Sequence, residues 1–355
     1  MSRKRRIGLF FVFSALLAGA AAYVLWQRYT GFADTPVAGI EAGESLQIER
    51  GDSFPQVLRK LRAVGVQDGQ DVEWQLLARQ IGAAGRLQVG EYALQPGATP
   101  RTLLAAMRDG KIISYRFTIV EGWNIRELRA ALAKAAPLLQ ETRQLDDAAL
   151  MKTLGHDGQH PEGRFLPETY QYNRGDSDLK ILRRAYDAMG KALDQAWNER
   201  AADTPLKNED EALVLASIVE KETGIASERP QIAGVFARRL KLGMLLQTDP
   251  TVIYGMGSRY AGNIRRQDLT TDTPYNTYTR AGLPPTPIAM PGVDALRAAT
   301  KPATGDALFF VAVGDGSGRH VFTRTLGEHQ AAVRDYLLRY RQQRQAPQPA
   351  PALPQ

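Results

Sequence analysis

The sequence of 355 residues contains no cysteine. This absence excludes disulfide bonds, a thiol nucleophile and lipid attachment through cysteine. It does not identify the compartment, because an oxidising compartment permits disulfides without requiring them. The sequence also has no Walker loop, no dinucleotide-binding glycine fingerprint and no Gly-x-Ser-x-Gly motif, so it gives no sign of the sites that these motifs build.

Acidic residues are absent from the first 28 positions, which hold five lysine or arginine residues. Without this segment the chain has 40 basic and 38 acidic residues, so the formal net charge is +2 in place of +7. The positive excess therefore reports on membrane topology rather than on a nucleic-acid surface. Because the remaining sequence has no basic stripe with interleaved aromatic residues, we expect no nucleic-acid partner.

A long uncharged run follows this basic start. Residues 7–26 contain no charged residue, and about twenty apolar residues are enough for a helix to cross a bilayer. Basic residues at positions 3–6 precede the run and only Arg28 follows closely, so the N-terminus should stay cytoplasmic. We therefore expect a basic stub at 1–6, a single transmembrane helix at 7–27 in the cell inner membrane, and a periplasmic body.

The alternative to an anchor is a cleaved signal peptide, with Ala18-Gly19-Ala20 as an imperfect cleavage site. The apolar run continues beyond that site, which favours an uncleaved helix. A linker of about 18 residues after Trp26 would then keep the first folded module close to the bilayer.

Residues 44–111 have the pattern of a small α+β module. Short strands are expected at 46–50 and 87–94, with two helices between them and a third helix that ends at Gly110. The order strand, helix, helix, strand, helix (βααβα) in so short a segment suits a LysM-like module.

The remaining body, residues 112–345, is predicted to be a mixed α+β catalytic domain with a helical core. Segments 307–313 and 319–324 flank a glycine-rich turn and predict a C-terminal β-hairpin. A last helix is expected at about 326–342. The tail at 346–355 has four prolines in ten residues and is predicted to be disordered.

Two glutamates, Glu220 and Glu222, lie near the end of an otherwise apolar helical segment. On a helix Glu222 shares a face with Leu215 and Ile218. Apolar surroundings and the helix C-terminus both disfavour the charged form and raise the pKa of a carboxyl group, which suits a general acid. Glu222 is therefore the candidate catalytic residue. Glu220 lies on a smaller, partly polar face, and we keep it as a second-choice acid or as a like charge that raises the pKa of Glu222. A solvated helix end is the alternative for both.

Side chains suited to sugar recognition follow this helix in loops. Amides, carboxylates and aromatic rings can bind hydroxyl groups and pack on pyranose rings, and the candidates are Gln247, Asp249, Tyr275, Asn276 and Tyr278. Ordinary turn chemistry is the alternative, because Thr248-Asp249-Pro250 is also a good helix start.

Other polar groups give weaker signals. Glu162 and Arg164 predict a structural salt bridge. His156 and His160 are four residues apart, but their segment is rich in glycine and offers no third ligand, so we expect no metal. The two remaining histidines, His320 and His329, are expected to be structural, with their ring nitrogens satisfied.

Several segments resemble the endolytic murein transglycosylase family, also called MltG or YceG-like. They include 218–223 (Ile-Val-Glu-Lys-Glu-Thr), 246–255 (Leu-Gln-Thr-Asp-Pro-Thr-Val-Ile-Tyr-Gly) and 275–278 (Tyr-Asn-Thr-Tyr). Further similar segments are 162–170, 238–240, 282–285 and 288–292. The resemblance extends over about residues 44–340, and the shared order of the motifs makes it specific.

The resemblance implies an enzyme that cleaves the β-1,4 bond between N-acetylmuramic acid and N-acetylglucosamine in nascent peptidoglycan strands. The C6 hydroxyl of muramic acid attacks in place of water and leaves a 1,6-anhydro end, so the enzyme is a lyase that limits strand length. The family pattern assigns the acid and base roles to Glu222, requires no cofactor and implies proximity to peptidoglycan synthases. A non-catalytic, membrane-anchored peptidoglycan-binding scaffold is the alternative.

Overall fold

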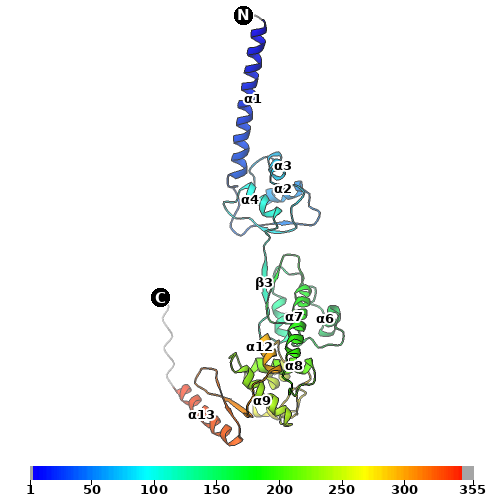
Figure 1. Ribbon diagram of the computed structural model, residues 1–355, viewed down its shortest axis with the longest axis vertical. Helices are drawn as coiled ribbons and strands as arrows, with labels where there is room; N and C mark the ends of the chain where they lie inside the picture. The colour runs from blue at the N-terminus through cyan, green and yellow to red at the C-terminus, as the bar shows by residue number, and fades with distance from the viewer. Residues whose placement is uncertain (1–2, 346–355) are drawn as a thin grey trace. The chain divides into compact units, whose positions relative to one another are not determined.

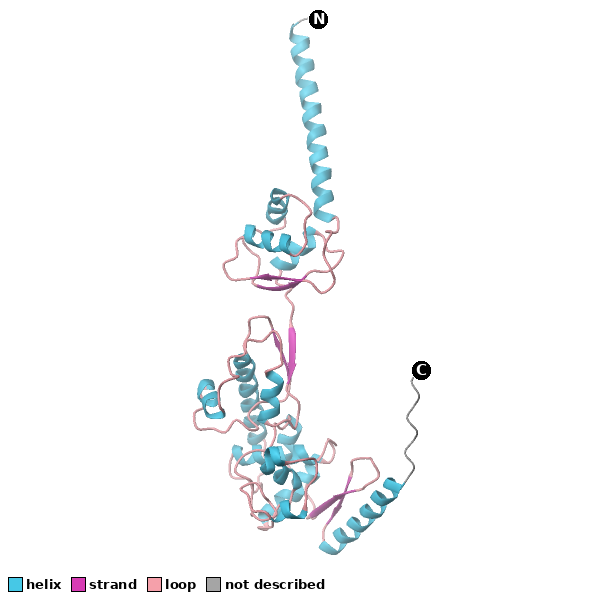
Figure 2. Cartoon of the chain, turned by 180° about the vertical axis from the view of Figure 1, so that it is seen from behind, coloured by secondary structure: helices cyan, strands magenta, loops and turns pink. Residues whose placement is uncertain are grey.

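The computed structural model describes residues 3–345, so the predicted tail at 346–355 lies outside the described residues. Helices dominate, and short strands pair into two-stranded sheets (Figures 1 and 2). This arrangement agrees with the α+β class that the sequence predicts.

The chain forms two compact units. The first unit runs to Tyr115 and includes Gln171–Asp176. The second unit comprises Arg116–Tyr170 and the chain from Ser177 onward. Each unit therefore has its own core, and each is described separately below.

The first unit begins with one long helix, α1 (Arg3–Asp34). Its segment Phe10–Asp34 is long and apolar enough to cross a membrane, as expected of the predicted anchor. The helix continues past residue 27, however, and Ala33 is buried in the core of the following module. The expectation of a linker between Trp26 and that module is therefore wrong, because the end of the helix packs against the module.

Five elements form the module of the first unit: β1 (Ser45–Ile48), α2 (Phe54–Ala63), α3 (Asp71–Gln80), β2 (Gly90–Ala93) and α4 (Pro100–Arg108). β1 and β2 pair antiparallel, with Ser45 opposite Ala93. The helices start at recognisable caps: the Thr102 amide donates to Thr99 Oγ1 at 3.2 Å, and Pro100 occupies the first turn of α4. The order of elements is the predicted βααβα.

The boundary between the units falls within a two-stranded sheet of β3 (Tyr115–Thr118) and β4 (Thr169–Tyr172). Between these strands the second unit forms α5 (Ile125–Leu132) and α6 (Asp147–Leu154). The long amphipathic helix α7 (Asp178–Asn198) follows β4.

The core of the second unit is built around α8 (Glu209–Glu222). Residues 212–219 are all buried, because this stretch is apolar around its whole circumference and must be covered on every side. Three helices provide this cover: α7, α9 (Arg229–Lys241) and α12 (Val293–Thr300).

Shorter elements complete the second unit. After α9 the chain forms α10 (Asp249–Met256), the 3₁₀ helix η1 (Gly257–Arg259) and α11 (Arg266–Thr270). After α12 come β5 (Phe309–Ala312), β6 (His320–Thr323) and α13 (Leu326–Gln345).

The predicted C-terminal hairpin is present, with Phe309 of β5 opposite Thr323 of β6 (Figure 2). Glu228, beside the start of α9, accepts a hydrogen bond from the His320 amide at 2.9 Å and contacts His320 Nδ1 at 2.8 Å. The structural role predicted for His320 is therefore confirmed, since its bonds hold the hairpin against α9.

Candidate functional site

Glu222 is the last residue of α8, and its side chain lines a cavity of about 490 Å³. The helix ends here because Thr223 takes an extended conformation, with φ −147°. The pKa of Glu222 is raised to about 7, chiefly by burial and also by the nearby Asp249 charge. A hydrogen bond from Thr248 and the Arg239 charge act in the opposite direction. At neutral pH the group can therefore both give and accept a proton.

The start of α10 supplies the polar neighbours of Glu222. Thr248 Oγ1 donates a hydrogen bond to Glu222 Oε1. The next residue, Asp249, lines the same cavity and accepts a hydrogen bond from the Tyr278 hydroxyl at 2.6 Å. Asp249 is not the N-cap residue of α10, since Thr248 holds that position.

A buried guanidinium supports this corner of the cavity. Arg239 Nε donates to the Leu308 carbonyl at 2.7 Å, and Nη1 donates to the Leu246 carbonyl at 2.8 Å. Its guanidinium carbon also lies 5.1 Å from the centroid of the Phe309 ring. Arg239 therefore connects α9, the segment before α10 and the hairpin, and its charge favours the ionised form of Glu222.

Gln247 also lines the cavity, with its backbone in the left-handed region at φ +50°. Only this non-glycine residue has a positive φ within residues 3–345. Such a conformation is uncommon, and here the Gln247 amide is fixed by a hydrogen bond to the Thr277 carbonyl at 3.1 Å. The bend directs an exposed amide side chain to the cavity.

The hairpin and α13 form an apolar wall of the cavity. The wall consists of Phe309, Phe310, Val311, Leu326, His329 and Val333. His329 stacks on Phe309, with ring centroids 5.2 Å apart, and burial lowers its pKa, so the ring is neutral at pH 7. Its Nδ1 is buried and has no hydrogen-bond partner within the described part of the chain. The prediction of a satisfied structural histidine is therefore wrong for His329.

Two of the predicted sugar-binding residues do not line this cavity. Asn276 is 1% exposed, and its Nδ2 lies within hydrogen-bonding distance of the carbonyls of Asp268, Leu269 and Thr271. Its Oδ1 accepts from the Tyr278 amide at 2.9 Å, so Asn276 positions loops and cannot reach a sugar in this conformation.

Tyr275 also points elsewhere. Its hydroxyl pairs with Thr286 at 2.8 Å, and its ring packs against Tyr254. The residues from the predicted set that do line the cavity are Glu222, Gln247, Asp249 and Tyr278.

Glu220 is directed into a different network. Its Oε1 pairs with Arg229 Nη2 at 2.9 Å, its Oε2 accepts from the Gly292 amide at 2.9 Å, and its side chain is 5% exposed. Glu220 does not line the Glu222 cavity, which argues against it as the acid. The like charge that acts to raise the pKa of Glu222 is that of Asp249.

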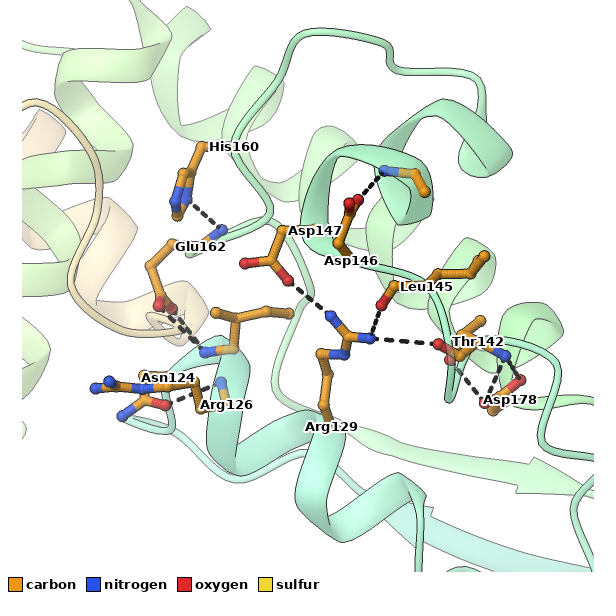
Figure 3. Close-up of polar contacts among 12 residues, drawn as sticks. Asn124, Arg126, Arg129, Thr142, Leu145, Asp146, Asp147, His160, Glu162 and Asp178 are labelled. Atoms are coloured by element: carbon orange, nitrogen blue, oxygen red, sulfur yellow. Dashed lines mark hydrogen bonds and ion pairs between the residues drawn. The ribbon is translucent and has the colours of Figure 1, made fainter. Parts of the chain in front are cut away.

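Glu162 is another glutamate with an elevated pKa, and its carboxyl group lies beside the N-terminus of α5. Glu162 is fully buried and accepts hydrogen bonds from the Ile125 amide at 3.1 and 3.2 Å (Figure 3) and from the Tyr254 hydroxyl at 2.9 Å. Burial raises its pKa to about 7. The predicted Glu162–Arg164 bridge is wrong, because Arg164 pairs with Asp210.

No cluster of three or more histidine, aspartate or glutamate side chains within residues 3–345 is arranged to hold a metal ion. His156 instead stacks on Tyr186, with ring centroids 3.9 Å apart. His160 Nδ1 accepts from the Glu162 amide at 3.2 Å (Figure 3). These contacts give both histidines structural partners.

Sequence reasoning did not assign roles to Thr248, Arg239 or the hairpin wall. The pattern around Thr248 signals a helix start, but it does not say that the threonine hydroxyl reaches Glu222. The paired phenylalanines at 309 and 310 were a possible signal, because strand residues alternate faces and both faces are apolar there.

Comparison with known proteins covers both units. A family model described as the YceG-like family matches residues 46–335. The endolytic murein transglycosylase of Bacillus subtilis (strain 168) is 31% identical over 281 residues, which is 74% of this chain and 77% of that protein. A protein of the same name from Streptococcus pneumoniae (strain D39) is 25% identical over 323 residues, or 88% of this chain. The match spans about half of that longer relative, 52%.

A solved structure is also similar. The crystal structure of a putative YceG-like protein from Listeria monocytogenes aligns with a TM-score of 0.54 and 26% identity, covering 81% of this chain and 98% of that one. The family model alone spans more than half of the sequence. The chain belongs to the YceG-like family.

Proposed function

We propose that the chain is an endolytic murein transglycosylase with Glu222 as its acid and base. The observation that carries this proposal is one carboxyl group with a pKa of about 7 that lines an open cavity beside polar and aromatic side chains. The names of the curated relatives support the same activity.

In the proposed reaction, protonated Glu222 gives its proton to the glycosidic oxygen between N-acetylmuramic acid and N-acetylglucosamine. The bond from C1 to this oxygen breaks, and the C6 hydroxyl of the same muramic acid forms a new bond to C1. Glu222, now a carboxylate, takes the proton from that hydroxyl. The products are a free 4-hydroxyl and a 1,6-anhydro end, water is not consumed, and the enzyme returns to its starting state.

The neighbours of Glu222 have distinct roles in this proposal. Thr248 holds one carboxyl oxygen, which leaves the other available for the substrate. Asp249, held by Tyr278, places negative charge where the sugar develops positive charge in an oxocarbenium-like transition state. Gln247 offers an amide to the sugar substituents, and Phe309 offers an apolar surface to a pyranose ring.

The location is part of the proposal. With α1 as a single transmembrane helix and its N-terminus in the cytoplasm, the module of the first unit and the whole second unit lie in the periplasm, next to nascent strands. Such a position also brings the enzyme near peptidoglycan synthases, so that cleavage limits the length of new strands.

The test is digestion of purified glycan strands, with product ends identified by mass. We expect anhydro ends from the wild type and none from Glu222→Gln. Glu209→Gln is the matched control, because Glu209 is in the first turn of the same helix and does not line the cavity.

The product ends also separate the alternatives. Reducing ends would identify a hydrolase that uses water, with Asp249 as the available second carboxylate. Strand binding without any cleavage by the wild type would identify the non-catalytic scaffold.

A further inference from the structure

A second cavity, of about 420 Å³, lies at the other end of α10 from the Glu222 cavity. The residues that line it come from α10, η1, α11 and the loops between them. The Glu222 cavity borders the first residue of α10, Asp249, whereas the second cavity borders Val252 and Met256. Its volume lies within the range of about 300–1,000 Å³ that is usual for small-ligand sites.

The charge of the second cavity is positive. Arg259 and Arg265 line it, and neither forms an ion pair with another side chain within residues 3–345. Asp268 is the acidic residue in the lining, and its Oδ2 accepts a hydrogen bond from the Arg265 amide at 2.7 Å. The nearby Asp272 is already paired with Arg280 at 2.8 Å. Two guanidinium groups are therefore available to an anionic ligand.

The lining chemistry differs from that of the Glu222 cavity. Aromatic side chains suited to sugar rings border the Glu222 cavity, namely Tyr278, Phe309 and Phe310. The polar groups that border the second cavity are guanidinium, amide, hydroxyl and carboxylate groups, its other lining residues are aliphatic, and none is aromatic. Guanidinium groups match carboxylates in geometry and charge, and amides such as those of Asn263 and Gln267 match peptide groups.

A chain of hydrogen bonds connects the two cavities. Asn276 Nδ2 lies 2.7 Å from the Thr271 carbonyl, and Thr271 lines the second cavity. Asn276 Oδ1 accepts from the Tyr278 amide, and the Tyr278 hydroxyl donates to Asp249 in the first cavity. The lining of the second cavity is therefore connected to the residues around Glu222.

We propose that the second cavity binds the peptide stem carried by muramic acid in the glycan strand, through the stem carboxylates on Arg259 and Arg265. This inference rests on the proposed transglycosylase function. Asp268 accommodates an ammonium group of the same peptide. Cleavage would then be directed to strands that carry peptides, and denuded strands would be poor substrates.

The test compares two substrates: peptide-bearing strands and the same strands after an amidase has removed the peptides. The double variant Arg259→Gln/Arg265→Gln is compared with the wild type and with Arg266→Gln. Arg266 is the matched control because it lies next to Arg265 on α11 but does not line the cavity. For the double variant we expect KM to rise about tenfold on peptide-bearing strands and to stay unchanged on denuded strands.

Binding of a free stem tetrapeptide, measured by calorimetry, gives a readout that does not need cleavage. The wild type and Arg266→Gln should bind it, and the double variant should bind it about tenfold more weakly. Absence of binding to the wild type, or equal binding to all three proteins, overturns the inference. Neither result affects the proposed function, which is tested separately by the product ends of the wild type and of Glu222→Gln.

Discussion

Glu222 and Glu162 are both glutamates whose pKa burial raises to about 7, yet their surroundings differ. Glu222 faces a cavity and has one hydrogen bond, from Thr248. Glu162 is closed off from solvent and is bound by the Ile125 amide and the Tyr254 hydroxyl. An elevated pKa therefore identifies a buried carboxyl group, and access to a cavity distinguishes a catalytic candidate from a structural one.

The largest expected effect is on activity at Glu222. Glu222→Gln removes the proton donor and should lower kcat by about 10²–10⁴-fold, the usual contribution of general acid–base catalysis. Folding should be retained, because the amide is isosteric and carries no charge. Counting anhydro ends and recording thermal melting in parallel checks both statements. A variant that melts normally but keeps its full rate would remove Glu222 from the mechanism.

The second prediction concerns pH and stability. The pKa of Glu162 is about 7 in the folded state against 4.5 for an ordinary glutamate, so the protonated form stabilises the fold. This stability is fully present below about pH 4.5 and is lost as the pH rises through 7, with a total on the order of 3 kcal/mol. Urea unfolding at several pH values should show that the free energy of unfolding falls more steeply with rising pH for the wild type than for Glu162→Gln.

The matched control for that series is Glu168→Gln, because Glu168 is exposed and close in sequence. The free energy of unfolding of Glu168→Gln should change with pH in the same way as that of the wild type. If the free energy of unfolding changed equally with pH in Glu162→Gln and in the wild type, Glu162 would titrate like a solvated residue.

The third prediction removes the Glu162 side chain. Glu162→Ala leaves the Ile125 amide and the Tyr254 hydroxyl without their acceptor and should cost about 1–3 kcal/mol of unfolding free energy. The anhydro product should stay the same, with the rate reduced only as far as the folded fraction is reduced. A loss of kcat in fully folded protein would show that Glu162 takes part in the reaction. Glu162 and Glu222 could then no longer be distinguished as structural and catalytic.

The smallest effect is expected at Thr248. Its hydrogen bond lowers the pKa of Glu222, so Thr248→Val should raise that pKa. The high-pH limb of kcat/KM, where the acid has lost its proton, should then move to higher pH by a fraction of a unit. A shift to lower pH, or no shift with normal folding, would mean that the limb belongs to another group.

Features encoded in short stretches of sequence were predicted well. The apolar run at 7–26, the βααβα order of the module and the hairpin around its glycine-rich turn depend on residues that are close in the chain. The apolar face that favoured Glu222 over Glu220 is likewise a property of one helix.

Features that depend on distant segments were missed or assigned wrongly. His329 reaches the cavity because α13 packs on the hairpin, and Asn276 is buried because α11 and the following Thr271 place three carbonyl groups around its amide. Local sequence predicted a sugar-binding amide for Asn276 and a structural role for His329, but it does not show what the fold places opposite each side chain.

Because α1 is one continuous helix whose end packs in the module, a rotation of the helix also rotates the module. Arg101 of the module pairs with Asp34 at the end of the helix at 2.7 Å, and Arg28 pairs with Glu73 at 3.1 Å, so the helix and the module turn together. One residue added within an α-helix rotates everything beyond it by about 100°. A single alanine inserted just before Arg28 would therefore turn the module relative to the preceding part of α1 without lengthening the helix by more than about 1.5 Å. Register along this helix, more than its length, sets the direction in which the module faces.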